Sequence, residues 1–209
     1  MLYDISPAIS PRLQVWPGDT PPSREILMDM ARGDSLTLCT LHSTVHAGAH
    51  ADAPSHYGRG HPSIDARSLD FYLGRCQVLR LPVPRGHCIT SADLPGPARA
   101  ERILLSTGTF PDPQVFNEDF AACTAGLVES LGSAGVRLIG IDTPSIDPFA
   151  SKGLPAHAAC LRNDLAILEG VMLGEVPEGI YELIALPLKL VGFDASPVRA
   201  VLRTVSPAS

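Results

Sequence analysis

The chain has 209 residues, of which 45% are hydrophobic and 18% charged, and its formal net charge at pH 7 is −6. This length predicts a single domain over residues 1–209, with ample apolar material for one large core. The acidic balance, in a chain whose basic clusters never exceed two residues, argues against a nucleic acid partner. No apolar run approaches the roughly 18 to 20 residues of a membrane span, and the opening MLYDISPAIS lacks the basic and apolar regions of a signal peptide. We therefore expect a cytoplasmic protein that does not enter a membrane.

The segment HAGAHADAPSH, residues 46–56, places three histidines and an aspartate among small residues. In a helix, Asp52 would point about 240° away from His46. In a straight strand, His46 and His50 would lie about 13 Å apart, too far for ligands of one metal. A shared site therefore needs a bent, extended segment, for which Gly48 can supply an unusual φ. Pro54 should end any regular ladder after Asp52.

Strands and one helix are predicted in the middle of the chain. CQVLRLPV, residues 76–83, is β-branched and apolar and precedes turn signals, as expected of a strand. RILLST, 102–107, and VRLIGID, 136–142, are typical of buried strands. Residues 117–134 predict a helix between them, with Asn117 as its N-cap and a glycine just beyond its end. A strand, a helix and a strand in this order predict a βαβ unit.

The last part of the chain predicts a short helix over 157–165, followed by strands in AILEGVML, 166–173, and YELIALPLKLVG, 181–192. Many strands and few helices predict an α/β fold built around a mixed sheet or a barrel-like strand core, not a regular doubly wound fold. Neither GxGxxG after a strand nor GxxxxGK[ST] occurs, so nucleotide binding has no support in the sequence.

The cysteines are odd in number, widely spaced and without a CxxC pair, which argues against a disulfide framework and against a thiolate zinc site. We expect all five to be small buried hydrophobes. They are Cys39, Cys76, Cys88, Cys123 and Cys160.

Two histidines and an aspartate from the 46–56 segment suit Zn²⁺ or Mn²⁺, and three protein ligands leave open positions, as in catalytic sites. A carboxylate can also bridge to a second metal. His157 and Glu169 are further candidates, although an ordinary histidine at a helix end and a solvated acid remain alternatives. Asp164 competes with Glu169 as a ligand, and Asp142 and Asp147 compete less strongly.

His56 lies beyond Pro54 and can reach the same pocket without being a ligand. A neutral imidazole beside a metal suits general acid/base catalysis near neutral pH. Trp16, the only tryptophan, lies in the proline-rich WPGDTP, where packing and ligand contact are equally plausible.

These residues match a known signature. HAGAHADAPSH resembles the His-x-Gly-x-His-x-Asp-x-Pro-x-His motif of the metal-dependent cyclase-like hydrolases, and most closely their kynurenine formamidase (arylformamidase) branch. The resemblance extends to DIS and WPGDTP near the start, to GIDTPSIDP, and to HAACLRNDLAILEG, so it spans most of the chain. Some relatives carry threonine where this chain has Ala49.

The resemblance implies a swivelling β/β/α fold, usually assembled as a homodimer, and a two-zinc site in which Asp52 is shared. The implied metal ligands are His46, His50, Asp52, His157 and Glu169. It further implies that His56 donates and accepts protons and that Trp16 contacts an aromatic substrate. The implied activity is the hydrolysis of N-formyl-L-kynurenine to L-kynurenine and formate, a step of tryptophan degradation.

The sequence is compatible with other functions. Related enzymes open other amide bonds, such as the ring of isatin, and the metal ligands cannot distinguish these substrates. A non-catalytic metal-binding module would need a closed coordination sphere and no His56, so it is disfavoured. A serine hydrolase is disfavoured because the sequence has no GxSxG.

Overall fold

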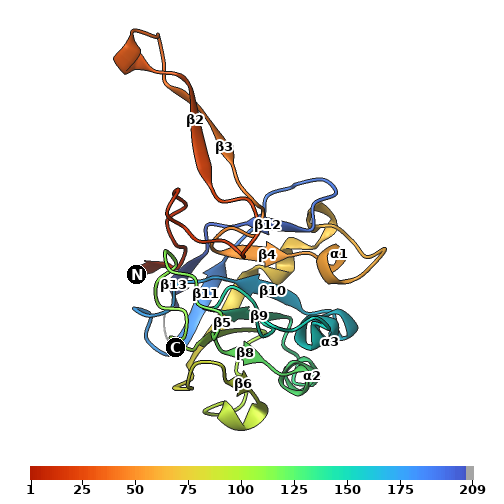
Figure 1. The fold of residues 1–209 in the computed structure, drawn as a ribbon. Helices are drawn as coiled ribbons and strands as arrows, with labels where there is room; N and C mark the ends of the chain where they lie inside the picture. The colour runs from red at the N-terminus through yellow and green to blue at the C-terminus, as the bar shows by residue number, and fades with distance from the viewer. Residues whose placement is uncertain (206–209) are drawn as a thin grey trace.

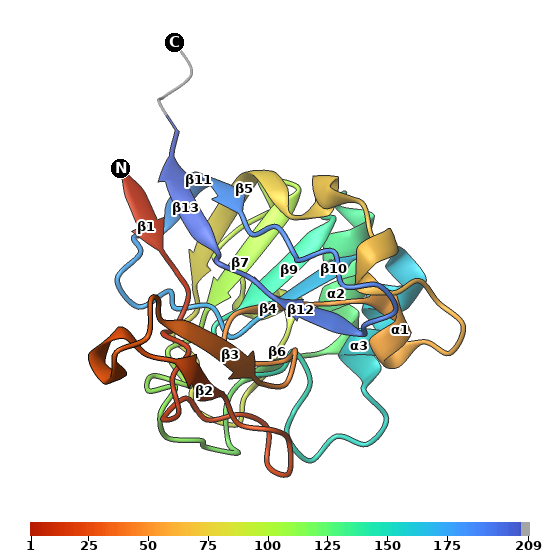
Figure 2. The ribbon, with the colours of Figure 1, turned by 90° about the horizontal axis from the view of Figure 1, so that it is seen from above.

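The computed structural model describes residues 1–205 and is organised around one large, curled, mixed sheet (Figures 1 and 2). The sheet has nine strands in the order β1 (Leu2–Asp4), β13 (Val201–Thr204), β11 (Gly179–Ile184), β5 (Leu73–Arg80), β7 (Arg102–Ser106), β9 (Leu138–Ile141), β10 (Ala166–Glu169), β4 (His50–Asp52) and β12 (Ala195–Pro197). The four central strands, β5, β7, β9 and β10, are parallel to one another, and the strands on both sides of them pair antiparallel. The predicted α/β fold with a mixed, barrel-like sheet is confirmed.

Two helices cover one face of the central strands (Figure 1). α2 (Ala125–Ser133) connects β7 to β9, which are parallel neighbours, so the predicted βαβ unit is confirmed. α3 (Pro155–Asn163) connects β9 to β10 in the same way. Since crossover connections bring β7, β9 and β10 side by side, the loops that follow these strands open at one edge of the sheet.

The central strands are buried on both faces, which explains their continuous apolar sequences. Alternate residues of β7 point to opposite sides: Ile103 and Leu105 pack against the helices, whereas Leu104 joins the core on the other face. The second core is closed by the curl of the sheet, with Tyr72 and Leu202 fully buried in it.

A hairpin stands clear of this body (Figure 1). It consists of β2 (Ser23–Met28) and β3 (Leu38–His42), paired antiparallel, with the short 3₁₀ helix η1 (Met30–Arg32) at its tip. Its exposed apolar side chains include Leu27, Leu38 and Leu41. The hairpin was not predicted.

The remaining elements are short. They are the helix α1 (Pro54–Tyr57), the paired strands β6 (Cys88–Ile89) and β8 (Ala122–Cys123), and the 3₁₀ helices η2 (Ile64–Ala66), η3 (Leu69–Phe71) and η4 (Ser91–Asp93). Within residues 1–205, no helix has the length and apolar character needed to cross a membrane.

The predicted helix over 117–134 was wrong in its first half. The helix begins at Ala125, where the side chain of Thr124 accepts a hydrogen bond from the backbone of Leu127. Asn117 does not cap it; its amide instead donates to Thr109 and Asp119 within a loop. Burial of residues 120–123 in the core overrides the local helical preference.

The boundaries of other predicted elements also moved. The helix predicted at 157–165 begins two residues earlier, at Pro155, a residue favoured in the first turn of a helix. The strand predicted over 166–173 ends at Glu169, because Gly170 has a φ of +67° and turns the chain. The strand predicted over 181–192 covers 179–184 only.

Three cysteines, Cys76, Cys123 and Cys160, are buried as expected. The prediction was wrong for Cys39, which lies on the projecting hairpin, and for Cys88, at the surface strand β6. All five are free, in agreement with the expected lack of a disulfide framework.

Candidate metal centre and substrate pocket

The 46–56 segment folds as a bent, extended chain. Its β4 portion holds His50 and Asp52, and the preceding turn places Gly48 at a φ of +64°. As a result, the ring centroids of His46 and His50 lie only 5.0 Å apart. A side chain at Gly48 would also meet Pro7, at 2.9 Å from its Cγ. The expected bend is confirmed, and so is the end of the strand before Pro54.

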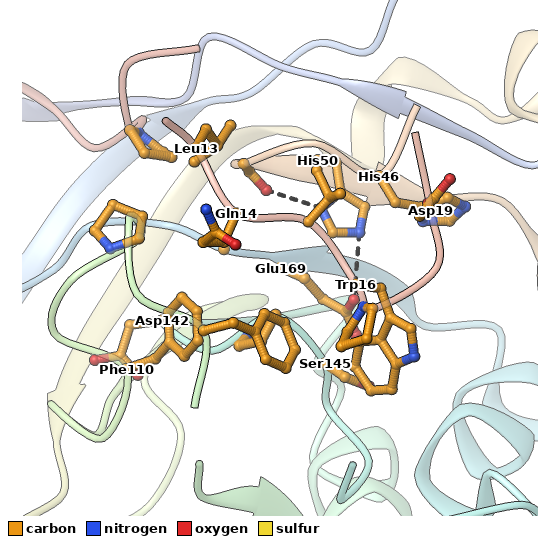
Figure 3. A pocket seen from close by; sticks show the side chains of 18 of the residues that line it. Leu13, Gln14, Trp16, Asp19, His46, His50, Phe110, Asp142, Ser145 and Glu169 are labelled. Carbon is orange, nitrogen blue, oxygen red and sulfur yellow. Dashed lines mark hydrogen bonds and ion pairs between the residues drawn. The ribbon is translucent and has the colours of Figure 1, made fainter. Parts of the chain in front are cut away.

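The pairing of β4 with β10 brings a second carboxylate, that of Glu169, next to His50. In this antiparallel register His50 lies opposite Glu169, and directly opposed residues project from the same face. The Nε2 of His50 is 3.3 Å from the Oε2 of Glu169 (Figure 3). The other Glu169 oxygen accepts a hydrogen bond from the backbone N–H of Ile146 at 2.7 Å, which fixes the carboxylate.

Asp52 lies at the centre of the cluster. Its side chain is 1% exposed, and neither carboxylate oxygen has a hydrogen-bond partner among the described residues. Three imidazole nitrogens surround these oxygens: His46 Nδ1 at 3.2 Å, His50 Nε2 at 3.5 Å and His157 Nε2 at 3.4 Å. An unpartnered buried carboxylate is costly unless a cation binds it.

The spacing fits a metal. Two atoms bound to one tetrahedral zinc at about 2.1 Å lie about 3.4 Å from each other. Two sets of side chains have ligand atoms close enough to share an ion, one of His46, Asp52 and His56, the other of His50, Asp52 and Glu169. Asp52 belongs to both sets, as expected of a bridging carboxylate. His157 lies outside both sets, although its Nε2 is 3.6 Å from Glu169 Oε1.

Each imidazole that faces Asp52 has an acceptor on its other nitrogen. The three pairs are His46 Nε2 with Asp194 Oδ2 at 3.1 Å, His50 Nδ1 with the Gly48 carbonyl at 2.9 Å, and His157 Nδ1 with Asp147 Oδ2 at 2.7 Å. Such partners fix the tautomer, so that the nitrogen facing the centre carries a lone pair for a metal.

Asp147 also fixes the start of α3. Its carboxylate accepts hydrogen bonds from the backbone N–H groups of Ala156 and His157, each at 3.0 Å. It therefore supports His157 and does not compete with Glu169. Asp164, the stronger competitor considered from the sequence, pairs with Arg67 outside the cluster. Asp142 accepts hydrogen bonds from Thr107 and Gly108 at the pocket wall.

The electrostatics of the cluster favour a bound positive charge. Burial opposes protonation of His46, yet its contacts with Asp52 and Asp194 outweigh burial and raise its pKa to about 9. The pKa of His157 is raised to about 10, because Asp147, Asp52 and Glu169 together outweigh its burial. Burial likewise opposes ionisation of Asp52, but the surrounding imidazoles hold its pKa well below the ordinary value. A divalent cation bound here would supply the positive charge that the raised pKa values of these histidines indicate.

His56 lies in the single turn of α1, at the rim of the cluster. Its Nδ1 is 3.2 Å from Asp194 Oδ2, and its ring centroid is 4.4 Å from that of His46. The side chain is 33% exposed, more than the other imidazoles of the cluster. The structure therefore brings His56 to the site, where proton transfer and metal binding are both within its reach.

A pocket of about 560 Å³ opens over the cluster (Figure 3). His46, His50, His56, His157 and Glu169 line its polar side. Trp16, Phe110 and Phe116 line an aromatic side, and Lys152 is the one lysine or arginine among the described lining residues. Trp16 also packs on Phe149, with ring centroids 4.8 Å apart. Trp16 therefore both packs against Phe149 and lines the pocket.

The structure brings all the predicted site residues together around one pocket. Sequence reasoning missed Asp194, which is remote in sequence and in no recognisable motif, and the supporting role of Asp147. It also missed Lys152, since a lone lysine in a loop carries no signal.

Solved structures of other proteins share this fold. A solved structure of a potential metal-dependent hydrolase with cyclase activity is 28% identical, with a TM-score of 0.85 and 99% of each chain covered. A predicted metal-dependent hydrolase from Bacillus stearothermophilus is also 28% identical, with a TM-score of 0.81 and 97% of each chain covered. Isatin hydrolase A from Labrenzia aggregata, at 19% identity, shares the fold, with a TM-score of 0.80 over 97% of this chain and 93% of its own.

A family model described as putative cyclase matches residues 3–148, well over half of the chain. The match includes the histidine-rich segment and Asp147 and ends before His157 and Glu169, which the structure adds to the same cluster. The chain therefore belongs to the putative cyclase family.

Proposed function

We propose that this protein is a metal-dependent amide hydrolase that converts N-formyl-L-kynurenine to L-kynurenine and formate. The observation that carries the proposal is Asp52, whose two buried, unpartnered oxygens are surrounded by three imidazole nitrogens beneath an open pocket. A purely structural metal site, closed by protein ligands, would not need an open pocket above it. The metal ligands in the proposal are His46, His50, Asp52, His157 and Glu169, holding zinc, or manganese in its place.

The lining of the pocket supports an aromatic substrate that bears a carboxylate. Trp16, Phe110 and Phe116 offer aromatic faces and edges to an aryl ring. Lys152 offers a positive charge to a carboxylate in a pocket whose other fixed charges, such as Asp19 and Glu169, are negative. N-formyl-L-kynurenine has both features, and in the proposal its ring lies on the aromatic side with its formamide group toward the polar side.

Chemically, the metals would lower the pKa of bound water and polarise the formyl oxygen when they are present. The chain's own contribution begins with orientation: Trp16 and Lys152 would hold the ring and the carboxylate at opposite ends of the substrate. His56 would then protonate the aniline nitrogen as the C–N bond breaks, because that nitrogen is a poor leaving group as an anion. Its position at the exposed rim allows it to exchange the proton with solvent after each turnover.

A second candidate is the opening of a cyclic amide such as isatin. The observation that favours it is the shared fold with isatin hydrolases, among them the enzymes from Labrenzia aggregata and Ralstonia solanacearum. Isatin lacks a carboxylate, so Lys152 would have no partner in that substrate.

The test is hydrolysis of N-formyl-L-kynurenine by the purified protein, followed by the absorbance of released kynurenine. Activity should fall on chelation and return with zinc or manganese. His56→Ala should lower kcat about 10²- to 10⁴-fold, as expected for loss of a general acid. Its metal content should stay at the wild-type value, measured by elemental analysis.

Isatin and unsubstituted formanilide serve as comparison substrates. A metal-loaded, folded protein that opens isatin but leaves formylkynurenine intact would refute the proposed substrate and support the second candidate. Loss of bound metal in His56→Ala would instead assign His56 as a ligand. Lys152→Met should raise KM for formylkynurenine but leave KM for formanilide unchanged, since formanilide has no carboxylate.

A further inference from the structure

Asp194 lies in the C-terminal part of the chain and reaches the metal centre through strand pairing. It immediately precedes β12, which pairs with β4, so that Ala195 lies opposite Asp52. The backbone carbonyl of Asp194 accepts a hydrogen bond from the N–H of Ala53 at 2.8 Å. These bonds fix its main chain beside the histidine-rich segment, although the side chain is 49% exposed.

One oxygen of Asp194 faces two imidazoles. Its Oδ2 is 3.1 Å from His46 Nε2 and 3.2 Å from His56 Nδ1. A carboxylate oxygen has more than one acceptor direction and can take a hydrogen bond from each ring. The two rings are close neighbours, with centroids 4.4 Å apart, so a single group can orient both.

We propose that Asp194 is a positioning residue that sets the tautomer and orientation of both His46 and His56. By accepting the Nδ1–H of His56, it leaves the Nε2 of that ring free to exchange a proton with substrate. By accepting the Nε2–H of His46, it leaves Nδ1 free to face Asp52 and a metal. The part concerning His56 rests on the proposed function, whereas the part concerning His46 rests on the geometry of the metal centre.

Asp194 differs from the acceptors that orient the other two imidazoles facing Asp52. His50 is oriented by the Gly48 carbonyl and His157 by Asp147, and each of these acceptors serves one ring. Asp194 connects a ring that faces the metal centre with the ring at the pocket rim. It is not itself placed as a ligand, because it lies at the Nε2 of His46 while Asp52 lies at the Nδ1 of the same ring.

The arrangement resembles in principle the carboxylate that orients the histidine of a catalytic triad, where loss of the carboxylate leaves the wrong tautomer and a much lower kcat. For Asp194 the expected loss is smaller, because the side chain is half exposed and water can replace part of its role. Removal of an outer partner of a metal-binding histidine typically weakens metal binding or activity about 10- to 100-fold.

The experiment compares Asp194→Ala, Asp194→Asn and Asp194→Glu with the wild type, and uses Asp112→Ala, in an exposed loop, as the matched control. The primary readout is the ¹⁵N NMR spectrum of zinc-loaded protein with labelled histidines, assigned with the aid of His46→Gln and His56→Gln. In the wild type, His56 should show a protonated Nδ1 and an unprotonated Nε2. In Asp194→Ala its two nitrogens should shift toward a mixture of tautomers, and Asp194→Glu should partly restore the wild-type pattern.

Metal affinity and kinetics give two further readouts. Competition with a chromophoric chelator should show zinc affinity lowered about 10-fold or more in Asp194→Ala. With metal saturating, kcat for formylkynurenine should fall about 10- to 100-fold while KM changes little, because Asp194 is not among the residues that line the pocket.

Wild-type ¹⁵N shifts for both histidines in folded Asp194→Ala, together with unchanged zinc affinity, would overturn the proposal. If Asp194→Ala does not fold, Asp194→Asn decides, since a neutral amide oxygen accepts weaker hydrogen bonds from the two rings than a carboxylate does. If the wild type does not hydrolyse formylkynurenine, the proposed function fails, while the NMR and zinc measurements still test the positioning role.

Discussion

Replacing Gly170 by alanine should distort the metal centre from its backbone side. Gly170 follows Glu169 directly and has a φ of +67°, and a Cβ at this position would lie 2.3 Å from the carbonyl oxygen of Gly48. The left-handed conformation costs an alanine about 1–2 kcal/mol. Relieving the contact needs a shift of about 1 Å, and such overpacking costs about 1–3 kcal/mol more. The sum is a destabilisation of about 2–5 kcal/mol.

Two measurements test this effect of Gly170→Ala. For a chain of this length, Tm falls about 2–4 °C per kcal/mol, so the melting temperature should drop by about 4–20 °C. The Gly48 carbonyl is also the acceptor for His50 Nδ1 at 2.9 Å, so its displacement should weaken zinc binding about 10- to 100-fold. Calorimetry and chelator competition measure the two effects separately.

Two matched variants separate the causes. Gly60 has a φ of +78° but open space around it, so Gly60→Ala should show only the conformational cost. Gly126, inside α2 and also without close neighbours, should tolerate alanine with an unchanged or higher Tm. If Gly170→Ala melts no lower than Gly60→Ala and keeps wild-type zinc affinity, the steric reasoning is refuted.

Four other outcomes are expected. The pKa values of His46 and His157 are raised from 6.5 to about 9 and 10, so protons on these histidines stabilise the metal-free fold below pH 6.5. This stability is lost as the pH rises through 9 and 10. Calorimetry should therefore show the Tm of the metal-free protein falling over that range, with a smaller fall after zinc loading. Trp16→Leu should raise KM for formylkynurenine about 3- to 10-fold with little change in kcat, as expected from loss of an aromatic contact; an equal loss in kcat would argue against simple ring binding. Asp147→Asn should weaken zinc binding about 10- to 100-fold, and unchanged affinity would contradict its role as partner of His157. Light scattering should give a homodimer, twice the chain mass of 22.1 kDa, and a monomeric mass at micromolar concentration would refute that expectation.

Much of the site could be predicted from one segment. A site shared by His46, His50 and Asp52 does not fit a helix, which turns Asp52 away from His46, or a straight strand, which separates the two histidines. The sequence therefore predicted a bent, extended segment, for which Gly48 can supply the φ. The structure has that bend. The central strands were predicted because they are buried on both faces and their apolar sequences are continuous.

The features that the sequence did not reveal depend on contacts between distant residues. Asp194 reaches the site only because β12 pairs with β4, a register that no local pattern encodes. The helix expected from Asn117 begins at Ala125 because residues 120–123 are buried and Ala122–Cys123 forms the strand β8. The β2–β3 hairpin lacks a core of its own and so gives no strong periodic signal.

The order of strands also has a consequence for biosynthesis. As the chain leaves the ribosome, the segment containing His46 and Asp52 emerges long before Glu169 and the strand that carries Asp194 into place. β1 finds its partner only in β13, near the end of synthesis. A nascent chain can therefore offer a metal only a loose, incomplete set of ligands, and tight capture must wait for the last strands. Stable metal incorporation should then follow translation, and chains stalled before β12 should exchange metal freely with cellular chelators.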